Sequence, residues 1–249
     1  MNSAINIVVL LFLIVTTSCN INTKTIRIYN NTLRSYIIYE DNFYNDLENW
    51  SIEQKPGGTV SIINKKLDIN DADGCTVWFN KKLCAPLIIE YDAVVIDDGG
   101  INDRVSDLNC FWMANDIHEP EDFFKRSATR GGIFQNYHDM QLYYVGLGGH
   151  NNTKTRFRRY AGKGERPCLP EHDLNDSIYL ITPNIKNKIR LVVYKKHIQY
   201  YRNDQLIYDV IDENPYTEGY FGIRTYKNHM TVDNFKVYGL VDNSNQGLK

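Results

Sequence analysis

The chain has 249 residues, of which 43% are hydrophobic and 12% aromatic, so it can bury one full core. It carries 28 Lys and Arg against 30 Asp and Glu, a formal net charge of −2. A protein so close to neutrality has no overall field that gathers nucleic acid, and no nucleic-acid partner is expected, although a local basic patch is compatible with these numbers.

The first 18 residues are interpreted as a signal peptide of the lipoprotein type. The apolar run "INIVVLLFLIV" is too short to cross a bilayer and leads into the small-residue stretch "TTSC". Cys19 then resembles the lipidated cysteine of a bacterial lipobox, although no Lys or Arg precedes the run and Thr16 stands where Leu is more usual. The prediction is an exported protein, periplasmic or anchored to the outer membrane through Cys19; ordinary secretion with an incidental cysteine is the alternative.

The rest of the chain divides into a polar tether at 19–38, a domain at 39–241 and a tail at 242–249. From Tyr39 onward, short runs rich in β-branched and aromatic residues, such as "LIIEYDAVVI" and "MQLYYVGLG", alternate with turn residues. No apolar stripe with helical period interrupts them. The predicted class is therefore all-β, a sandwich or barrel.

The C-terminal part, "IRLVVYKKHIQYYRNDQLIYDV" followed by "GYFGIRTY" and "DNFKVYGL", reads as a meander and two further strands. Together with the opening "YEDNFYNDLENWSI", it resembles concanavalin-A-like jelly-roll domains, the lectin and glucanase sandwiches. That resemblance implies two curved antiparallel sheets, with the first strand beside the last and sugars bound on an open concave face.

Four cysteines follow Cys19, namely Cys75, Cys84, Cys110 and Cys168. In an oxidising compartment, an even number permits two disulfides, and Cys75 and Cys84 could face each other across a hairpin. Four free thiols are the alternative. No pair has a His partner at zinc-ligand spacing, so a structural zinc is not expected.

The stretch "HNNTKTRFRRY" at 150–160 holds four of the chain's 28 Lys and Arg and contains no acid. Side chains alternate along a strand, so Arg156, Arg158 and Tyr160 share one face. Phe157 is the natural core residue of the other face, which directs the two arginines outward. For Phe111 against Trp112, and for Tyr143 against Tyr144, alternation alone does not decide which side chain faces out.

The stretch "GYFGIRTYKNHM" follows the same rule. If Phe221 and Ile223 belong to the core, then Arg224 and Tyr226 face outward, and the turn "KNH" carries His229 to the same side. Aromatic faces stack on pyranose rings, while Arg and Asn donate to hydroxyls and carboxylates. The pattern predicts a carbohydrate site; solvated strand faces covered by long side chains are the alternative.

Several stretches resemble the YesU-like proteins and their uncharacterised relatives, namely "FWMANDIHEPEDFF", "YYVGLGGHNNTKTRFRRY", "RPCLPEHDLND" and "GIRTYKNHMTVDNFKVY". These are exported concanavalin-A-like proteins of bacterial polysaccharide-utilisation systems, and the resemblance spans residues 39–240. It implies a role in polysaccharide breakdown, with an acidic, uronic-acid-containing polysaccharide or oligosaccharide as partner. The protein is expected to be a monomer.

The residue types favour β-elimination over hydrolysis. A glycosidase needs two carboxylates at a fixed separation, and no Glu-x-Asp-x-x-Glu run occurs; "HEPED" at 118–122 is interrupted by Pro. A lyase needs a base and groups that neutralise a uronate. The predicted catalytic residues are Tyr144, His150, Arg158 and His229. A Tyr base would need its pKa lowered from about 10, which nearby arginines would favour. The predicted substrate-binding residues are Asn109, Trp112, Asn152, Arg156, Tyr160, Arg224 and Tyr226.

Other functions stay open on this sequence. A non-catalytic carbohydrate-binding module would use the same aromatic and basic residues, and a glycoside hydrolase of the same fold or a structural surface protein are further alternatives. No cofactor is expected. The run "DDGGINDRVSD" at 97–107 could hold a structural calcium, but it lacks the EF-hand pattern and is interpreted as a plain polar loop.

Overall fold

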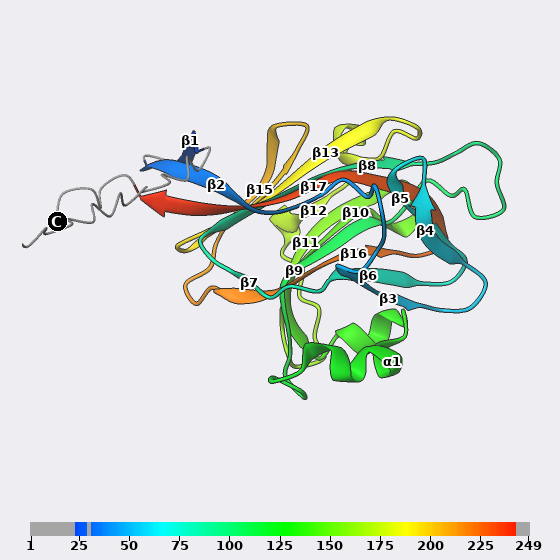
Figure 1. Ribbon diagram of the computed structural model, residues 1–249, viewed down its shortest axis with the longest axis horizontal. Helices are drawn as coiled ribbons and strands as arrows, with labels where there is room; N and C mark the ends of the chain where they lie inside the picture. The colour runs from blue at the N-terminus through cyan, green and yellow to red at the C-terminus, as the bar shows by residue number, and fades with distance from the viewer. Residues whose placement is uncertain (1–22, 29–30, 243–249) are drawn as a thin grey trace, which may run out of the picture.

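The computed structural model describes residues 23–28 and 31–242, which form two antiparallel sheets packed face to face (Figure 1). The all-β sandwich predicted from the sequence is confirmed. In spatial order, the first sheet contains β1 (Lys24–Ile28), β2 (Asn31–Asp41), β17 (Asn228–Asp242), β8 (Leu87–Val95), β13 (Lys186–Tyr194), β14 (His197–Arg202) and β15 (Gln205–Ile211). Beside β17 in this sheet lie β5 (Lys66–Asp71) and then β4 (Thr59–Ile63).

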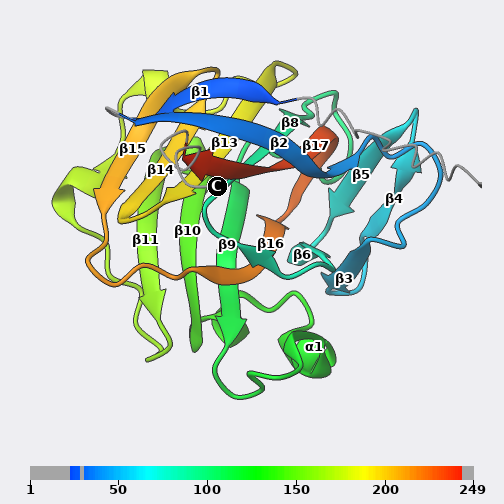
Figure 2. The same cartoon turned by 60° about the vertical axis from the view of Figure 1, so that its left-hand side comes forward.

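The second sheet lies across from the first, as the turned view in Figure 2 also shows. In spatial order, it contains β12 (Asp173–Leu174), β11 (Lys154–Ala161), β10 (Met140–Gly148), β9 (Leu108–Asp116), β16 (Glu218–Thr225), β6 (Cys75–Phe79) and β3 (Trp50–Gln54), with β7 (Leu83–Cys84) beside β16. Many neighbouring strands are distant in sequence, so the fold is held by long-range pairing.

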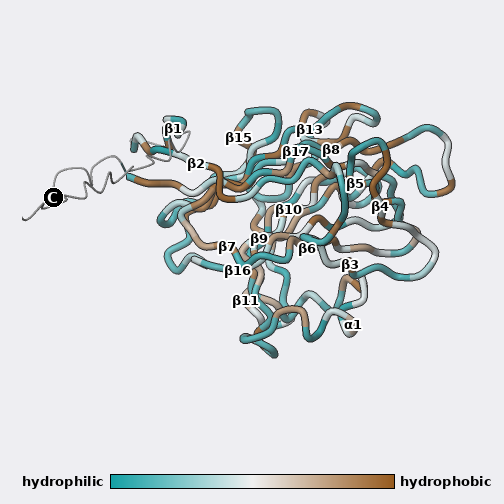
Figure 3. The backbone as a smooth tube through the Cα atoms, viewed as in Figure 1, coloured by the Kyte–Doolittle hydropathy of each residue, from teal (hydrophilic) through white to brown (hydrophobic). Residues whose placement is uncertain are grey.

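Alternation along the strands builds the core. In β8, Ile89, Tyr91 and Ala93 are buried between the sheets, while Glu90 and Asp92 face outward. The hydrophobic stretches accordingly gather in the strands, and many of the connecting loops are hydrophilic (Figure 3).

The four cysteines among the described residues are free thiols. Burial raises the pKa of Cys110 to about 12, so this thiol stays protonated at neutral pH.

The N-terminal part of the domain differs from the prediction. Instead of a tether, residues 24–28 and 31–41 form β1 and β2, and β2 pairs with the last strand, β17. The reason is the alternation of apolar residues: Ile28 and Leu33 pack on Ile88, on the outer face of the first sheet. The predicted signal peptide, Cys19 and most of the predicted tail lie outside the described residues. No helix in the described part of the chain is long and apolar enough to span a membrane.

Residues 117–139, here called the cover segment, connect β9 to β10 and lie on the side of the second sheet that faces away from the core (Figures 1 and 2). The segment contains three short helical turns, η1 (Phe123–Arg126), α1 (Ser127–Arg130) and η2 (Phe134–Tyr137). The other short helical elements are α2 (Gly149–Asn152), η3 (Pro170–His172) and η4 (Ser177–Tyr179).

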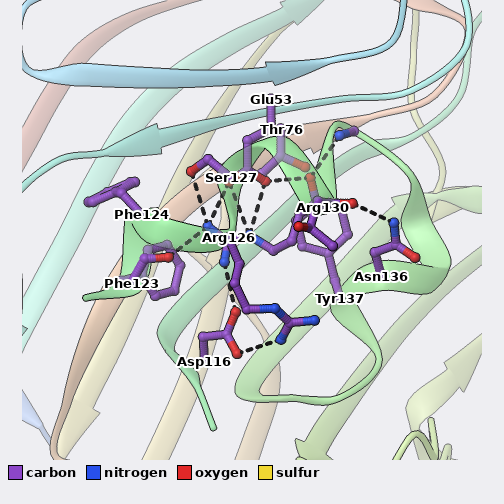
Figure 4. Close-up of polar contacts among 12 residues, drawn as sticks. Glu53, Thr76, Asp116, Phe123, Phe124, Arg126, Ser127, Arg130, Asn136 and Tyr137 are labelled. Carbon is purple, nitrogen blue, oxygen red and sulfur yellow. Dashed lines mark hydrogen bonds and ion pairs between the residues drawn. The ribbon is translucent and has the colours of Figure 1, made fainter. Parts of the chain in front are cut away.

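A buried ionic network fastens the cover segment to the sheet (Figure 4). Arg130 is fully buried and donates to Glu53 on β3 from Nη2, at 2.7 Å, and to Asp116 on β9 from Nη1, at 2.8 Å. The Tyr137 hydroxyl donates to the same Glu53 carboxylate at 2.7 Å. Because each buried charge has an opposite partner, the network fixes where the cover segment lies.

Candidate functional site

The strand register aligns side chains in rows on the outer face of the second sheet, here called the groove face. One row reads Arg156, Gly146, Asn109 and Arg224, from β11 to β16. The next reads Arg158, Tyr144, Phe111 and Gly222. The prediction from alternation that Arg156, Arg158 and Arg224 share a face is therefore confirmed.

The cover segment closes part of this face. Trp78, Phe111 and Tyr160 are fully buried in an aromatic cluster that the cover residues Phe123 and Tyr137 complete. Trp78 stacks on Phe111, with ring centroids 5.6 Å apart, and Phe123 contacts Trp78 edge-on at 4.9 Å. These rings stabilise the cover segment and are closed to a ligand. Tyr160, predicted to bind substrate, is among them.

Two adjoining cavities remain open beside the cover segment, and together they form a groove. The inner cavity, of about 340 Å³, and the outer cavity, of about 280 Å³, share Asp107, Phe134, Tyr144 and Tyr226 as lining residues. The inner cavity is further lined by Lys55, Asp73, Asn109, Ile133, Gln135 and Arg224. The outer cavity is further lined by Arg104, Gly146, Gly149, His150, Asn151, Lys154, Arg156, Arg158 and Arg166.

The outer cavity is strongly cationic, but most of its positive charges are paired. Arg156 donates to Asp173 from Nε at 2.9 Å and from Nη2 at 3.0 Å, and the other Nη lies 2.6 Å from His150 Nε2. Arg158 and Arg166 differ: among the described residues, no carboxylate lies within 4.0 Å of either. Arg158 donates to the backbone carbonyl of Arg166, whose guanidinium lies over the Phe134 ring at 5.1 Å.

Tyr144 forms the floor between the two cavities. Its ring folds over Gly146, so that a Cβ built at Gly146 would lie 2.4 Å from the Tyr144 hydroxyl; only glycine leaves room for this arrangement. Burial raises the pKa of Tyr144 well above its usual value, although Arg224 and Arg158 oppose this shift. The expectation that nearby arginines lower the pKa of Tyr144 is therefore wrong, because desolvation outweighs them.

Three further predicted residues do not contact the groove. Trp112 is fully buried between the sheets, where it packs on Tyr143 and Phe157, and Phe111 is the member of its pair that faces the groove side. Asn152 exchanges two hydrogen bonds of 2.8 Å with the backbone of Ile181 and holds that loop in place. His229 is the third.

His229 lies on β17 of the first sheet rather than beside Arg224. Its ring nitrogens lie 2.9 Å from Asp103 Oδ1 and 3.0 Å from Asp68 Oδ2. Burial disfavours the charged imidazole, but the hydrogen bonds to the two carboxylates outweigh it and raise the pKa of His229. The turn "KNH" passes the chain from the second sheet to the first, so alternation within β16 does not extend to His229. Its role is to tie the 97–107 loop to β5.

The groove face has no free carboxylate pair of the kind a glycosidase uses, among the residues described. Glu53 and Asp116 are neutralised by Arg130, and Asp173 by Arg156. The two acids that line the cavities are also paired, Asp107 with Arg104 and Asp73 with Lys55. "HEPED" lies in the cover segment, where Glu119 pairs with Lys125. The described residues also contain no group of three or more His, Cys, Asp or Glu side chains placed to hold a metal ion.

Sequence reasoning missed several lining residues. Phe134 comes from the cover segment, Arg166 from the loop after β11, and Arg104 from the 97–107 loop, where it donates to Asp107 at 2.6 Å. All three lie outside the strands, so strand alternation could not have placed them. The one available signal was the "GKGERP" stretch at 162–167, which extends the basic character of β11.

The sandwich is similar to several solved structures at low sequence identity. A protein of unknown function with a galectin-like fold from Bacillus subtilis aligns with a TM-score of 0.64 and 18% identity, over 83% of this chain and 97% of that one. The carbohydrate-binding module CBM66 from Bacillus subtilis aligns at 0.53 and 13% identity, over 78% and 96%. The Bacillus licheniformis beta-glucanase aligns at 0.53 and 13%, over 81% and 97%. The concanavalin-A-like jelly-roll fold is thereby confirmed.

Sequence comparison adds one match. A family model described as a domain of unknown function, DUF6250, matches residues 69–235. That span runs from β5 to β17 and contains every residue of the outer cavity. No curated protein sequence matches the chain.

Proposed function

Because the chain belongs to the DUF6250 family, whose description assigns no function, we propose a function from the groove itself: the protein binds an acidic, uronic-acid-containing oligosaccharide without cleaving it. The observation that carries this proposal is the pair Arg158 and Arg166, two guanidinium groups with no carboxylate within 4.0 Å in the described chain, on a groove that also presents aromatic rings.

The two arginines suit a sugar carboxylate. A guanidinium and a carboxylate form two parallel hydrogen bonds, which fix the orientation of the sugar as well as its charge. Phe134 and Tyr226, which is 41% exposed, supply apolar ring surface beside them for the sugar ring. The structural neighbours named as a carbohydrate-binding module and a glucanase support a saccharide as the ligand class.

Binding without turnover fits the chemistry of the groove better than either reaction. Hydrolysis needs two carboxylates flanking the scissile bond, and the acids described on the groove face are paired with cations, Asp73 with Lys55 and the others with arginines. β-Elimination needs a base of suitable pKa, but burial raises the pKa of Tyr144, and His229 lies on the other sheet. His150 Nε2 faces Arg156 Nη1 at 2.6 Å, which occupies its lone pair.

Calorimetric titration with uronic-acid oligosaccharides tests the proposal. A hydrogen bond to a charged group contributes ~1.5–3 kcal/mol, so Arg158→Ala should raise Kd roughly ten- to a hundredfold. Arg190→Ala is the matched control, because Arg190 pairs with Glu90 on the outer face of the first sheet. Absence of binding to every acidic glycan would refute the proposal. A rise in the absorbance of unsaturated uronates during incubation would replace it with a lyase.

We also propose that the protein is exported and anchored by a lipid on Cys19, and that it serves polysaccharide breakdown. The support is the N-terminal sequence, with its short apolar run followed by "TTSC", together with the resemblance to YesU-like proteins. A single lipid anchor would leave the groove free to meet a glycan outside the cytoplasm.

A further inference from the structure

Arg224, in the inner cavity, is a buried guanidinium without a direct ionic partner. Its exposure is 2%, and among the residues described no carboxylate lies within 4.0 Å of it. It donates to the carbonyl of Gly132 at 2.7 Å and to Thr76 Oγ1 at 3.2 Å. Its guanidinium also lies over the rings of Phe134 and Tyr137, at 5.3 and 5.4 Å.

The acids around Arg224 are engaged elsewhere. Asp107 and Asp73, which line the same cavity, pair with Arg104 and Lys55, and Glu53 pairs with Arg130. Asp71 accepts from the backbone N–H groups of Gly74 and Lys227, and burial raises its pKa even though Arg224 opposes that shift. A buried charge is costly without a partner, so the guanidinium retains capacity for an anion.

Asn109 adds an unsatisfied acceptor beside Arg224. The two residues are partners in the ladder between β9 and β16, and Asn109 is only 3% exposed. Its Nδ2 donates to Asp107 Oδ1 at 3.2 Å, whereas its buried Oδ1 has no hydrogen-bond partner. The reverse orientation of the amide would set an oxygen against the Asp107 carboxylate, which only accepts, so the orientation is fixed.

The cation next to a free acceptor matches a sugar acid: Arg224 donates to the carboxylate, and Asn109 accepts from a neighbouring hydroxyl. We propose that the inner cavity is a second uronate subsite, so that the ligand carries at least two acidic residues. This inference rests on the proposed function, which places the first acid at Arg158 and Arg166.

Spacing separates the two acids. The backbones of Arg224 on β16 and Arg158 on β11 lie three strand steps apart, with β9 and β10 between them, which is ~14 Å across the sheet. The Arg158 guanidinium donates to the carbonyl of Arg166, whereas that of Arg224 donates to Gly132 and Thr76, so we assign the two groups to different acids. The ligand class is therefore an oligosaccharide with repeated uronic acids rather than a neutral chain with one acidic end.

Titration calorimetry on the full chain tests the second subsite with two tetrasaccharides of equal length, one with a uronic acid at every position and one with a single terminal uronic acid. The wild type should bind the first at least tenfold more tightly. The ratio of the two dissociation constants should fall toward one in Arg224→Gln and should stay at the wild-type value in Arg190→Ala. Arg158→Ala should weaken both ligands, because each uses the outer subsite.

Arg224 is buried, so a second variant protects the test against misfolding. Asn109→Ala removes the free acceptor, and Asp107 keeps Arg104 and Ser106 as hydrogen-bond donors, so no charge is left unpaired; this variant should also reduce the ratio of the two affinities. Equal affinity of the wild type for the two tetrasaccharides, or an equal loss for both ligands in Asn109→Ala, would overturn the second subsite and leave the proposed function standing. Failure of both ligands to bind would overturn the proposed function itself.

Discussion

Arg130 holds the cover segment onto the groove face, and its replacement by Met should show how strongly. The side chain is fully buried and contacts two carboxylates, Glu53 and Asp116, as well as the backbone carbonyl of Phe123 at 2.9 Å. Met has a similar length and no charge. In the variant, Asp116 keeps Arg126 as a partner, whereas Glu53 keeps only the Tyr137 hydroxyl.

The expected decrease in the free energy of unfolding of Arg130→Met follows from the burial of the ion pairs. Removing one partner of a buried ion pair costs ~3–5 kcal/mol, because the remaining charge stays desolvated. That is a large share of the ~5–15 kcal/mol that stabilises a typical domain. Arg126→Met is the matched control: Arg126 pairs with the same Asp116 at 2.9 Å, but its side chain is 26% exposed. Its loss should cost ~1 kcal/mol or less, since solvent screens the pair.

Equilibrium unfolding in urea, followed by tryptophan fluorescence, measures both variants. Trp78 packs against the cover residue Phe123, so its emission reports on release of the cover segment. The double variant Glu53→Gln, Arg130→Met should recover stability relative to Arg130→Met, because it removes the stranded charge. If Arg130→Met cost no more than Arg126→Met, the network would not fasten the cover segment, and the argument from burial would be refuted.

Two further predictions concern regions away from the groove. The pKa of His229 is raised in the fold, so its contribution to stability is full below the unfolded value of ~6.5 and is lost as pH rises through the folded value. His229→Gln should therefore destabilise the protein in urea titrations at pH 5.5 and have little effect at pH 9; an equal loss at both would contradict the linkage. Metabolic labelling with a radioactive fatty acid should mark the wild type and leave Cys19→Ala unlabelled, and an unlabelled wild type would favour ordinary secretion.

Strand alternation predicted the part of the site that lies on strands. Arg156, Arg158 and Arg224 share the groove face because the side-chain period of a strand is two and because Phe157 and Ile223 are fixed in the core. The spacing of the strands and turns predicted a sandwich or barrel, and the resemblance to concanavalin-A-like domains narrowed this to a jelly roll. Alternation predicts which face of the sheet a side chain lies on, but not whether other residues cover it. Tyr160 lies on the groove face as predicted, yet it is fully buried and cannot contact a ligand there.

The failures arise where tertiary packing decides. Which of Phe111 and Trp112 faces the core depends on the strands that pair with β9, and these are distant in sequence. Trp112 packs in the core against Tyr143. The cover segment has no helix long enough to show a period; its position depends on Arg130 reaching two acids that lie 77 and 14 residues away. Local sequence patterns do not predict contacts between residues so far apart in the chain.

The cover segment explains why the groove differs from an open concave face. It buries the aromatic rings of β6 and β9, Trp78 and Phe111, which would otherwise offer stacking surface, and it supplies Phe134 in exchange. It also places the Gly132 carbonyl on Arg224 and the Phe134 ring under Arg166. The segment thus removes apolar surface from the face and orients two guanidinium groups along the groove that remains, which supports the proposed recognition of acidic groups over stacking as the source of specificity.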